Sequence, residues 1–315
     1  MEKNEINQQA KGGSELMLER LYKDLPSELL DHFQIIPCRV REVNPDKKRI
    51  LWLQDLPNDK ECSHLADPAS RKRFDKIVFN SYWQQQMFNV YLGVPFSEGV
   101  VLPNAIYPIR ICGDCKEPIH SKRTIRLIYH TTPHRGLEIL VPVFEELSRT
   151  DPYLELDVYS SFSLYGQSWT DRNKPYEEIF ERCRQHPKIR YHGAVTNQTI
   201  REALCHSDIF AYPCIWPETA CLAAIEAMSA RNVIVCSSYG VLPFTTGGFA
   251  QLYPYTEDKA EHTLRFKTAL EKTILRMRQE NGFTTLLEQQ KKYADTMFDW
   301  THVREDWKLL LSSLI

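Results

Sequence analysis

The sequence predicts an α/β protein with parallel sheets, organised as two domains. Residues 208–236 carry the clearest signal, because they read as a strand, a loop, a helix and a second strand. Strands that alternate with helices form βαβ units, which build parallel sheets. A chain of 315 residues with 43% hydrophobic content is long enough for two such domains.

The first helix is expected to begin after Gly12 and Gly13. Three leucines fall on one face of it at helical spacing, namely Leu18, Leu21 and Leu25. Pro26 should end the helix at the preceding residue, because the residue before a proline disfavours helical backbone. Two glycines before a helix permit close approach of an anion, and the alternative is a flexible helix start with Ser14 as N-cap.

The rest of the chain continues the alternation of short strands and helices. Ahead of residue 110, the expected elements are strands at 33–36, 49–53 and 76–79 and a helix at 82–92. Beyond residue 123, the expected elements are strands at 124–129, 154–159, 187–191, 208–212 and 233–236, and helices at 137–148, 197–205 and 220–230. After residue 248 we expect only helices.

The loop between strand 208–212 and helix 220–230 is the main candidate for a ligand site. Parallel sheets bind ligands beyond the carboxyl ends of their strands, at helix N-termini. Amide N–H groups there lack helical partners and carry the positive end of the helix dipole, so an anionic phosphate suits them. The residues that would supply these amides are Thr219, Ala220, Cys221 and Leu222.

Two carboxylates frame this loop. Glu218 directly precedes the predicted helix, and Glu226 lies roughly 12 Å further along at about 1.5 Å per residue. This separation is too large for one acid/base pair and suits a long ligand held at two points through hydroxyl groups. Glu226 has apolar neighbours, so its carboxylate must find a donor. The alternative is a helix-end charge at Glu218 and a satisfied structural carboxylate at Glu226.

These residues resemble the motif of a known family. The pattern resembles the donor-binding signature of the retaining nucleotide-sugar glycosyltransferases of family 4. It consists of Pro-Glu at 217–218, seven further residues, Glu-Ala-Met at 226–228, a strand and the run 239–243. The resemblance implies the GT-B fold, in which two Rossmann-like domains with parallel sheets face an interdomain cleft and a C-terminal helix crosses back. It also implies that Glu218 contacts the transferred sugar and that Glu226 holds the ribose hydroxyls.

The resemblance covers nearly the whole chain and suggests its division. Residues 1–110 would form an abridged acceptor-side domain, because polar residues stand where the family has an apolar first strand. Residues 111–123 would be the linker, and 124–290 the Rossmann-like domain that binds the nucleotide sugar. Residues 291–315 would be the C-terminal helix that packs back on the first domain. Gly12 and Gly13 would then face the donor phosphates or the acceptor.

Arg135 is the second residue to which the resemblance gives a catalytic role. It precedes Gly136 in a strand-to-helix loop, where the family carries a basic residue that binds the donor diphosphate. The family's other basic residue, several positions earlier, is replaced here by Tyr129 or His130. Arg135 would therefore carry the positive charge largely alone, whereas without the resemblance it reads as a solvated surface charge.

Further contacts follow from the same resemblance. Gly193 and Ala194 would meet the nucleobase, while His192 before them could equally be a buried histidine at a strand end. Gln54 stands where the family often has a histidine near the reaction centre, and its amide cannot accept a proton, although it can bind a sugar hydroxyl. The remaining candidates for sugar or acceptor contact are Asp55, Asn104, His134 and Trp216.

The resemblance implies a retaining transfer from a UDP- or GDP-linked sugar to a hydroxyl acceptor on a glycan or glycolipid. The helix amides and Arg135 would stabilise the leaving diphosphate, and attack would occur from the front face without a side-chain base. No Asp-x-Asp motif is present, so we expect no metal and no other cofactor. Two alternatives remain, a non-hydrolysing sugar-nucleotide epimerase and a catalytically degenerate sugar-nucleotide-binding module.

Composition limits the partners. A net charge of -2 gives no general reason to bind nucleic acid, and nine cysteines without a disulfide framework are expected to be reduced. The N-terminus is too polar for a signal peptide and no run of about eighteen apolar residues occurs, so we expect a cytoplasmic protein. The expected partners are a nucleotide sugar and a carbohydrate or lipid-linked acceptor, with weak peripheral membrane contact. The oligomeric state is left open.

Overall fold

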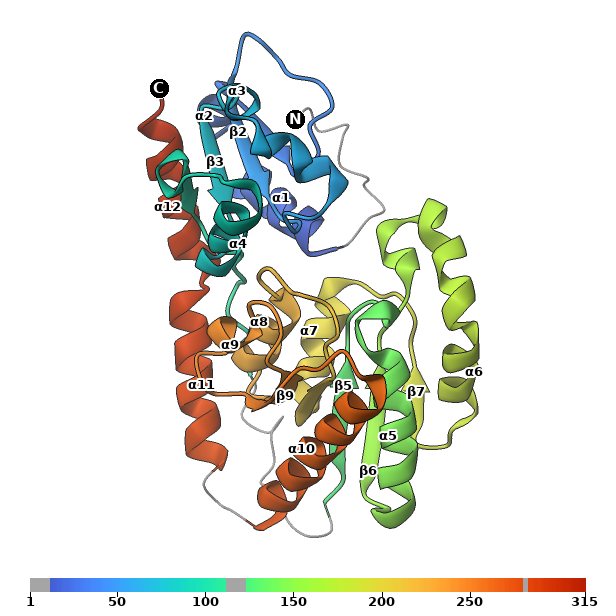
Figure 1. Cartoon of the computed structure of the whole chain (residues 1–315). Helices are drawn as coiled ribbons and strands as arrows, with labels where there is room; N and C mark the ends of the chain where they lie inside the picture. Colours follow the sequence, from blue (N-terminus) through green and yellow to red (C-terminus); the bar gives the residue numbers. More distant parts are fainter. Residues whose placement is uncertain (1–11, 112–122, 280–282) are drawn as a thin grey trace. The chain divides into compact units, whose positions relative to one another are not determined.

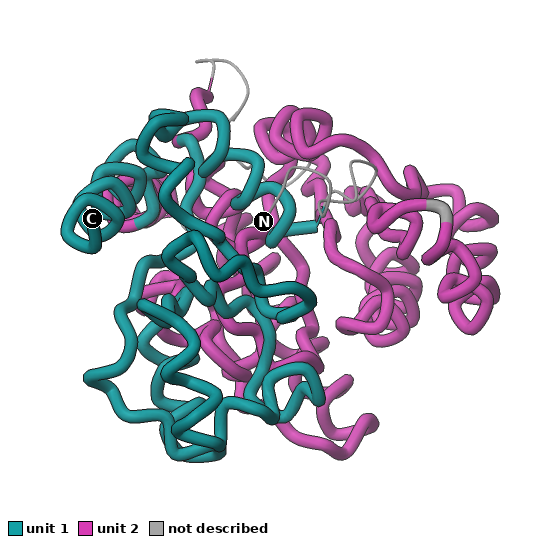
Figure 2. The backbone as a smooth tube through the Cα atoms, turned by 90° about the horizontal axis from the view of Figure 1, so that it is seen from above, with its two compact units in different colours: residues 1–8, 12–107, 298–315 teal, residues 9–11, 108–297 magenta. Residues whose placement is uncertain are grey.

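The computed structural model describes residues 12–111, 123–279 and 283–315, so most of the predicted linker lies outside the described residues. The described chain divides into two compact units (Figures 1 and 2). Unit 1 comprises Gly12–Tyr107 and Phe298–Ile315, and unit 2 comprises Pro108–Met297. Each unit has its own parallel sheet, as the alternation of strands and helices predicts.

Unit 1 contains a four-stranded parallel sheet in the order β1-β2-β3-β4. Its strands are β1 (Phe33–Pro37), β2 (Lys48–Leu53), β3 (Lys76–Phe79) and β4 (Gly99–Val101). Its helices are α1 (Gly13–Asp24), α2 (Ser27–Leu30), α3 (Pro68–Arg71), α4 (Tyr82–Leu92) and α12 (Trp300–Ser312), with 3-10 turns η2 (Lys60–Ala66) and η3 (Phe96–Glu98). The first three strands and α4 confirm the prediction. Three-residue β4 was not predicted, because so short a run shows no alternation.

Helix α1 ends as predicted but starts differently. Pro26 stops it, and Leu25 is the C-cap. The N-cap is Gly12, whose carbonyl accepts a bond from the Leu16 N–H at 3.0 Å, so the alternative of Ser14 as N-cap is wrong. Leu18 is buried with the other two leucines of its face, which confirms the helical spacing.

The C-terminal helix α12 belongs to the core of unit 1. The ring centres of Trp307 and Trp52 on β2 are 4.8 Å apart. The Trp300 indole N–H donates to the Asp24 carboxylate of α1 at 2.7 Å. Because both indoles are buried, α12 is held in the core of unit 1, which also contains α1.

Unit 2 contains a six-stranded parallel sheet in the order β10-β9-β8-β5-β6-β7. Its strands are β5 (Ile125–Tyr129), β6 (Leu154–Val158), β7 (Ile189–Tyr191), β8 (Ile209–Tyr212), β9 (Val233–Ser237) and β10 (Gln251–Tyr253). The first five confirm the prediction to within two residues at either end. The expectation of helices alone after residue 248 is wrong, because β10 adds to the edge of the sheet beside β9.

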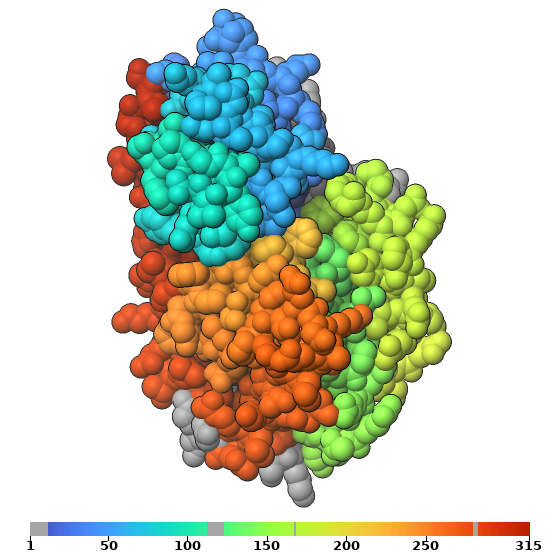
Figure 3. Space-filling view, viewed as in Figure 1, coloured from blue at the N-terminus to red at the C-terminus, as the bar shows by residue number. Residues whose placement is uncertain are grey.

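Helices cover both faces of this sheet. They are α5 (Leu137–Thr150), α6 (Glu177–Gln185), α7 (Asn197–His206), α8 (Leu222–Ser229), α9 (Leu242–Thr245), α10 (Lys259–Gln279) and α11 (Phe283–Met297), with 3-10 segments η4 (Pro133–Arg135), η5 (Phe162–Tyr165) and η6 (Gln167–Tyr176). The side chains of α5 and α10 lie side by side on one face, seen in green and orange in Figure 3, and α7, α8 and α11 pack together on the other. Strands covered on both faces are apolar throughout, which explains the fully buried run of β8.

Among the described residues, no helix has both the length and the apolar character needed to cross a membrane.

Candidate functional site

The site lies where the strand order of the unit 2 sheet reverses. β5 pairs with β6 on one side and with β8 on the other, and the chain runs outward from each of the two inner strands. In open parallel sheets, the connections from the two inner strands lead to opposite faces, and ligands bind outside the carboxyl ends of these strands. These two loops contain Arg135 and Glu218.

Arg135 and Glu218 are in direct contact. The Arg135 guanidinium donates from Nη1 to Glu218 Oε1 at 2.6 Å, and the Tyr212 hydroxyl donates to the same oxygen at 2.5 Å. Glu218 is only 5% exposed, so these donors replace water around its charge. Burial raises the pKa of Tyr212 well above its ordinary value, which keeps the phenol protonated as a donor. Tyr212 was not predicted as a site residue. The usable signal was its position as the last residue of a predicted strand, directly before the loop that contains Glu218.

Two glycines allow the loops to approach each other this closely. Gly136 has φ +129°, and a Cβ built on it would lie 2.2 Å from the Pro213 carbonyl oxygen. Gly240 has φ +60°, and its Cβ would lie 2.6 Å from the Glu218 backbone N and O. The Val241 N–H then donates to the Glu218 carbonyl at 2.9 Å. The backbone of Glu218 is therefore held by the loop after β9.

Helix α8 begins later than predicted. It starts at Leu222 with Cys221 as N-cap, so Thr219 and Ala220 belong to the loop and not to the helix. Cys221 adopts a left-handed conformation with φ 62°, which is rare for a residue with a Cβ and turns the chain into the helix. Its carbonyl accepts the first helical bonds, from the Ala224 and Ile225 N–H groups. The amides that open the helix follow Cys221.

Glu226 lies in the interior of α8 and has the donors that its burial requires. It is 4% exposed. Asn197 donates through Nδ2 to both carboxylate oxygens at 3.1 and 3.0 Å, and Arg201 donates to Oε1 at 3.3 Å. Both donors lie on α7, one helical turn apart. The need for a donor is thus confirmed, while contact of Glu226 with a ribose stays a prediction.

Gly193 and Ala194 follow β7 at the carboxyl edge of the sheet. Gly193 has φ +66° and open space where a Cβ would stand. Beside it, His192 stacks on Tyr159 with ring centres 4.2 Å apart, and its Nε2 lies 2.8 Å from an Asp157 oxygen. His192 is exposed, so the interpretation as a buried histidine is wrong. The aromatic pair Tyr159–His192 was not predicted, because nothing in the sequence relates the ends of β6 and β7.

His134 and Trp216 lie next to the ion pair. The His134 ring stacks on Phe162 with centres 5.2 Å apart, and its centre is 5.0 Å from that of Trp216. Burial, with added repulsion from Arg135 and Arg172, lowers the pKa of His134 to about 4. Burial lowers the pKa of His130 to about 3. Both rings are therefore neutral at pH 7. Neither supplies a second positive charge beside Arg135, where the resembled family has another basic residue.

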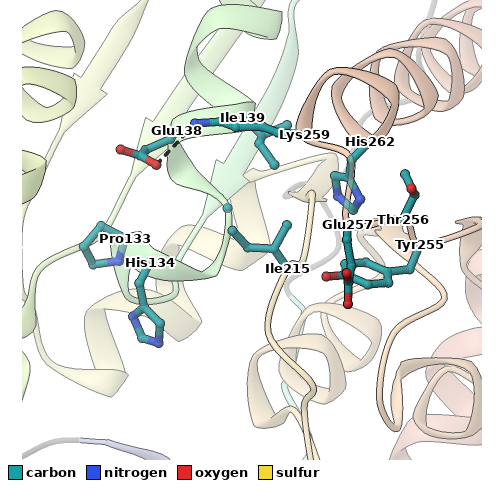
Figure 4. A pocket seen from close by; sticks show the side chains of 11 residues that line it. Pro133, His134, Glu138, Ile139, Ile215, Tyr255, Thr256, Glu257, Lys259 and His262 are labelled. Carbon is teal, nitrogen blue, oxygen red and sulfur yellow. Dashed lines mark ion pairs between the residues drawn. The ribbon is translucent and has the colours of Figure 1, made fainter.

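A cavity of about 300 Å³ lies beside this group (Figure 4). His134 and Gly136 line one side, and residues 255–257 after β10 line the other. Its polar groups include the Glu138–Lys259 ion pair at 3.6 Å and the Glu257 carboxylate. Two carboxylates against one ammonium disfavour a phosphate and suit the hydroxyl groups of a neutral sugar.

The remaining predicted residues belong to unit 1. Gln54 and Asn104 exchange two hydrogen bonds between their amides, at 2.7 and 3.2 Å. The Asp55 N–H donates to Cys38 Sγ at 3.2 Å, and burial raises the pKa of the Asp55 carboxyl. Burial, with added repulsion from Asp55, raises the pKa of Glu15 in the first turn of α1, which Gly12 and Gly13 open. The structure thus groups these residues at the carboxyl edge of the unit 1 sheet.

The chain is similar to known glycosyltransferases. Residues 116–251 match the family described as glycosyl transferases group 1. One subunit of the human phosphatidylinositol N-acetylglucosaminyltransferase is 27% identical over 143 residues, which are 45% of this chain and 28% of that protein. The chain therefore matches less than a third of that relative's length.

Two solved structures share its architecture. Sucrose-phosphate synthase from Thermosynechococcus elongatus aligns with a TM-score of 0.65 and 14% identity, over 85% of this chain and 68% of its own. Anabaena HepE, solved with UDP and glucose, aligns with a TM-score of 0.62 and 16% identity, over 85% of this chain and 72% of its own. The GT-B fold predicted from the resemblance is confirmed.

Proposed function

Because residues 116–251 match the group 1 glycosyl transferases and the chain has the GT-B fold, we propose that this protein transfers a sugar from a nucleoside-diphosphate sugar to a hydroxyl acceptor. The observation that carries the proposal is the Arg135–Glu218 contact of 2.6 Å at the reversal of strand order. A cation and a carboxylate, both largely shielded from water, suit a substrate with an anionic leaving group and adjacent hydroxyls.

The donor would lie along the carboxyl edge of the unit 2 sheet. We place its ribose at Glu226, its diphosphate between Arg135 and the first amides of α8, and its nucleobase near Gly193 and Ala194. Glu226 supports this role because a carboxylate can accept bonds from two ribose hydroxyls. A uracil or guanine base fits the proposal, and the relative HepE was solved with UDP.

Transfer breaks the bond between the anomeric carbon and the phosphate oxygen, and negative charge develops on the diphosphate. The Arg135 guanidinium can stabilise this charge, because it carries further N–H donors besides the Nη1 that pairs with Glu218. Its Nε is buried and has no partner among the described residues. We propose attack from the front face, with retention, and with the acceptor proton passing to the leaving phosphate oxygen. This route requires neither a metal nor a side-chain base.

The cavity beside His134 would receive a neutral sugar unit of the donor or of a carbohydrate or lipid-linked acceptor. Glu257 and the Glu138–Lys259 pair offer both acceptors and a donor to sugar hydroxyls. The relative HepE, solved in complex with UDP and glucose, supports a carbohydrate at this fold.

The proposal is tested by incubating the protein with UDP- and GDP-linked sugars and measuring diphosphate release with and without glycan or glycolipid acceptors. Acceptor-dependent release of the diphosphate supports a transferase. Interconversion of donors without release would identify an epimerase, and binding without turnover would identify a degenerate module. Failure to bind any nucleotide sugar would overturn the proposal.

A further inference from the structure

The two oxygens of the Glu218 carboxylate have different environments. Oε1 accepts bonds from Arg135 at 2.6 Å and from Tyr212 at 2.5 Å. Within the described part of the chain, no hydrogen bond reaches Oε2. One oxygen is therefore bonded to the protein, and the other has no donor within the described part of the chain.

Packing fixes the Tyr212 hydroxyl in place. Its side chain is fully buried at the end of β8. Its ring stacks on Phe210 at 5.1 Å and meets the ring of Tyr129 on the neighbouring strand at 6.1 Å. A ring that is packed on two sides by sheet residues cannot rotate without disturbing the core. The Tyr212 hydroxyl therefore keeps its position and holds Glu218 Oε1 in place.

We propose that Tyr212 is a positioning residue for Glu218, which keeps Oε1 bonded to the protein and presents Oε2 to a hydroxyl group of the transferred sugar. This inference rests on the proposed function. Arginine and carboxylate groups prefer a two-pronged contact that uses both oxygens. Tyr212 occupies Oε1 from a second direction and holds the carboxylate in a one-pronged contact with Arg135. A carboxylate oxygen repels phosphate, so the group that Oε2 receives is a hydroxyl.

Removal of the Tyr212 hydroxyl should allow Glu218 to rotate into the two-pronged contact. Both oxygens would then face Arg135, and the sugar hydroxyl would lose its acceptor. The substitution should weaken binding of the sugar and leave binding of the nucleotide unchanged. The proposed ribose contact is Glu226, and this residue and its partners lie on helices α7 and α8. Tyr212→Phe is the smallest change that tests this, since the ring and its packing remain.

Tyr129→Phe is the matched control. Tyr129 is also fully buried, ends the adjacent strand and donates its hydroxyl, at 2.9 Å, to the Thr132 carbonyl instead of Glu218. Calorimetry would measure the affinities of wild type and both variants for UDP, for GDP and for their glucose and mannose conjugates. We expect Tyr212→Phe to reduce the preference for the sugar conjugate over the bare nucleotide by about tenfold, whereas Tyr129→Phe changes it by less than about twofold.

A double-mutant cycle with Glu218→Gln separates positioning from general damage. If Tyr212 acts through Glu218, Tyr212→Phe should have less than about a twofold further effect in the Glu218→Gln background. The inference would be overturned if the effects of Tyr212→Phe and Glu218→Gln on this preference were additive, or if Tyr212→Phe and Tyr129→Phe had equal preferences for the sugar conjugate. The proposed function would still stand in either case. Absence of nucleotide-sugar binding by the wild type would overturn the proposed function, and this inference with it.

Discussion

The charge of the site is set by the pairing of Arg135 with Glu218. The sequence assigned them to separate contacts, and the structure joins them through one oxygen. The positive charge of Arg135 is therefore balanced before any donor arrives. In the proposed function, the diphosphate would bind the remaining nitrogens of this guanidinium while the bond to Glu218 persists.

Arg135→Ala should lower turnover by roughly 10²–10³-fold at saturating donor, with a smaller effect on donor affinity, because the charge on the leaving diphosphate grows in the transition state. Arg135→Lys should recover only part of the loss, since a point charge replaces a planar fork. Turnover and calorimetric affinity are measured together, with Arg184→Ala as an exposed control.

Removal of Arg135 also leaves the buried Glu218 carboxylate with one donor fewer, which costs stability. The double variant Arg135→Ala/Glu218→Gln removes that penalty and is checked by circular dichroism. Near-normal turnover in a folded Arg135→Ala protein would assign diphosphate stabilisation to the α8 amides.

Glu226 is expected to be a donor contact. Glu226→Gln should weaken nucleotide binding by about 2–3 kcal/mol, because the ribose hydroxyls lose a charged acceptor while the shape of the side chain is kept. Calorimetric titration with UDP and GDP measures the loss. Glu288→Gln on the exposed surface of α11 serves as the control. Unchanged affinity in the folded variant would support the alternative of a structural carboxylate paired with Asn197 and Arg201.

The loop between β8 and α8 owes its shape to contacts with other segments. Gly240 supports the Glu218 backbone from the loop after β9, and Thr245 donates its hydroxyl to the Ala220 carbonyl at 2.9 Å. These contacts explain how Cys221 is held at positive φ, a conformation that costs about 1–3 kcal/mol and needs support from its surroundings.

Gly240→Ala should impair activity more than its backbone strain alone predicts. Its Cβ would lie 2.6 Å from the Glu218 backbone, so that residue must move. Gly93→Ala is the matched control, because Gly93 has φ +66° and no atom within 4 Å of a built Cβ. Both variants should lose about 1–2 kcal/mol from the left-handed conformation. Turnover and urea midpoints are compared, and similar losses of turnover in the two variants would mean that Gly240 does not position Glu218.

The stability of the protein should fall as the pH drops below 6.5. Burial lowers the pKa of His130 and His134 to about 3 and about 4, and it also lowers the pKa of His262, whose Nε2 lies 2.9 Å from the Tyr253 hydroxyl. Between these values and 6.5 the unfolded chain binds more protons than the folded one, so protonation favours unfolding. His130 and His134 each contribute about 1.4 kcal/mol per pH unit within this window.

Urea unfolding at pH 7, 6 and 5 measures this slope. His262→Gln should flatten the decline of the free energy of unfolding, because one buried neutral imidazole is removed. The raised pKa values of Glu15 and Asp55 act in the opposite direction, so the difference between wild type and variant isolates the histidine. Equal slopes would mean that His262 carries its proton in the folded protein.

Most of the elements follow from local sequence. Helical spacing located α1 and α4, and β-branched or apolar runs located the strands of both sheets to within two residues at most. The strands that were not predicted are β4 and β10, each three residues long, and the nine-residue helix α6 was not predicted either. Such short strands are defined by the neighbour that they pair with, and a linear pattern does not identify that neighbour.

The α/β class, the loop of the candidate site and the chemical types of Arg135, Glu218 and Glu226 follow from the amino-acid sequence, because periodicity and residue type are local properties. Tertiary contacts bring Arg135 to Glu218, place the Tyr212 hydroxyl on the same oxygen and set the start of α8 after Cys221. Each of these depends on segments far apart in the chain, brought together by the strand order at β5 and β8 and by backbone approach at Gly136 and Gly240. Contacts of this kind arise from packing, which no single stretch of sequence encodes.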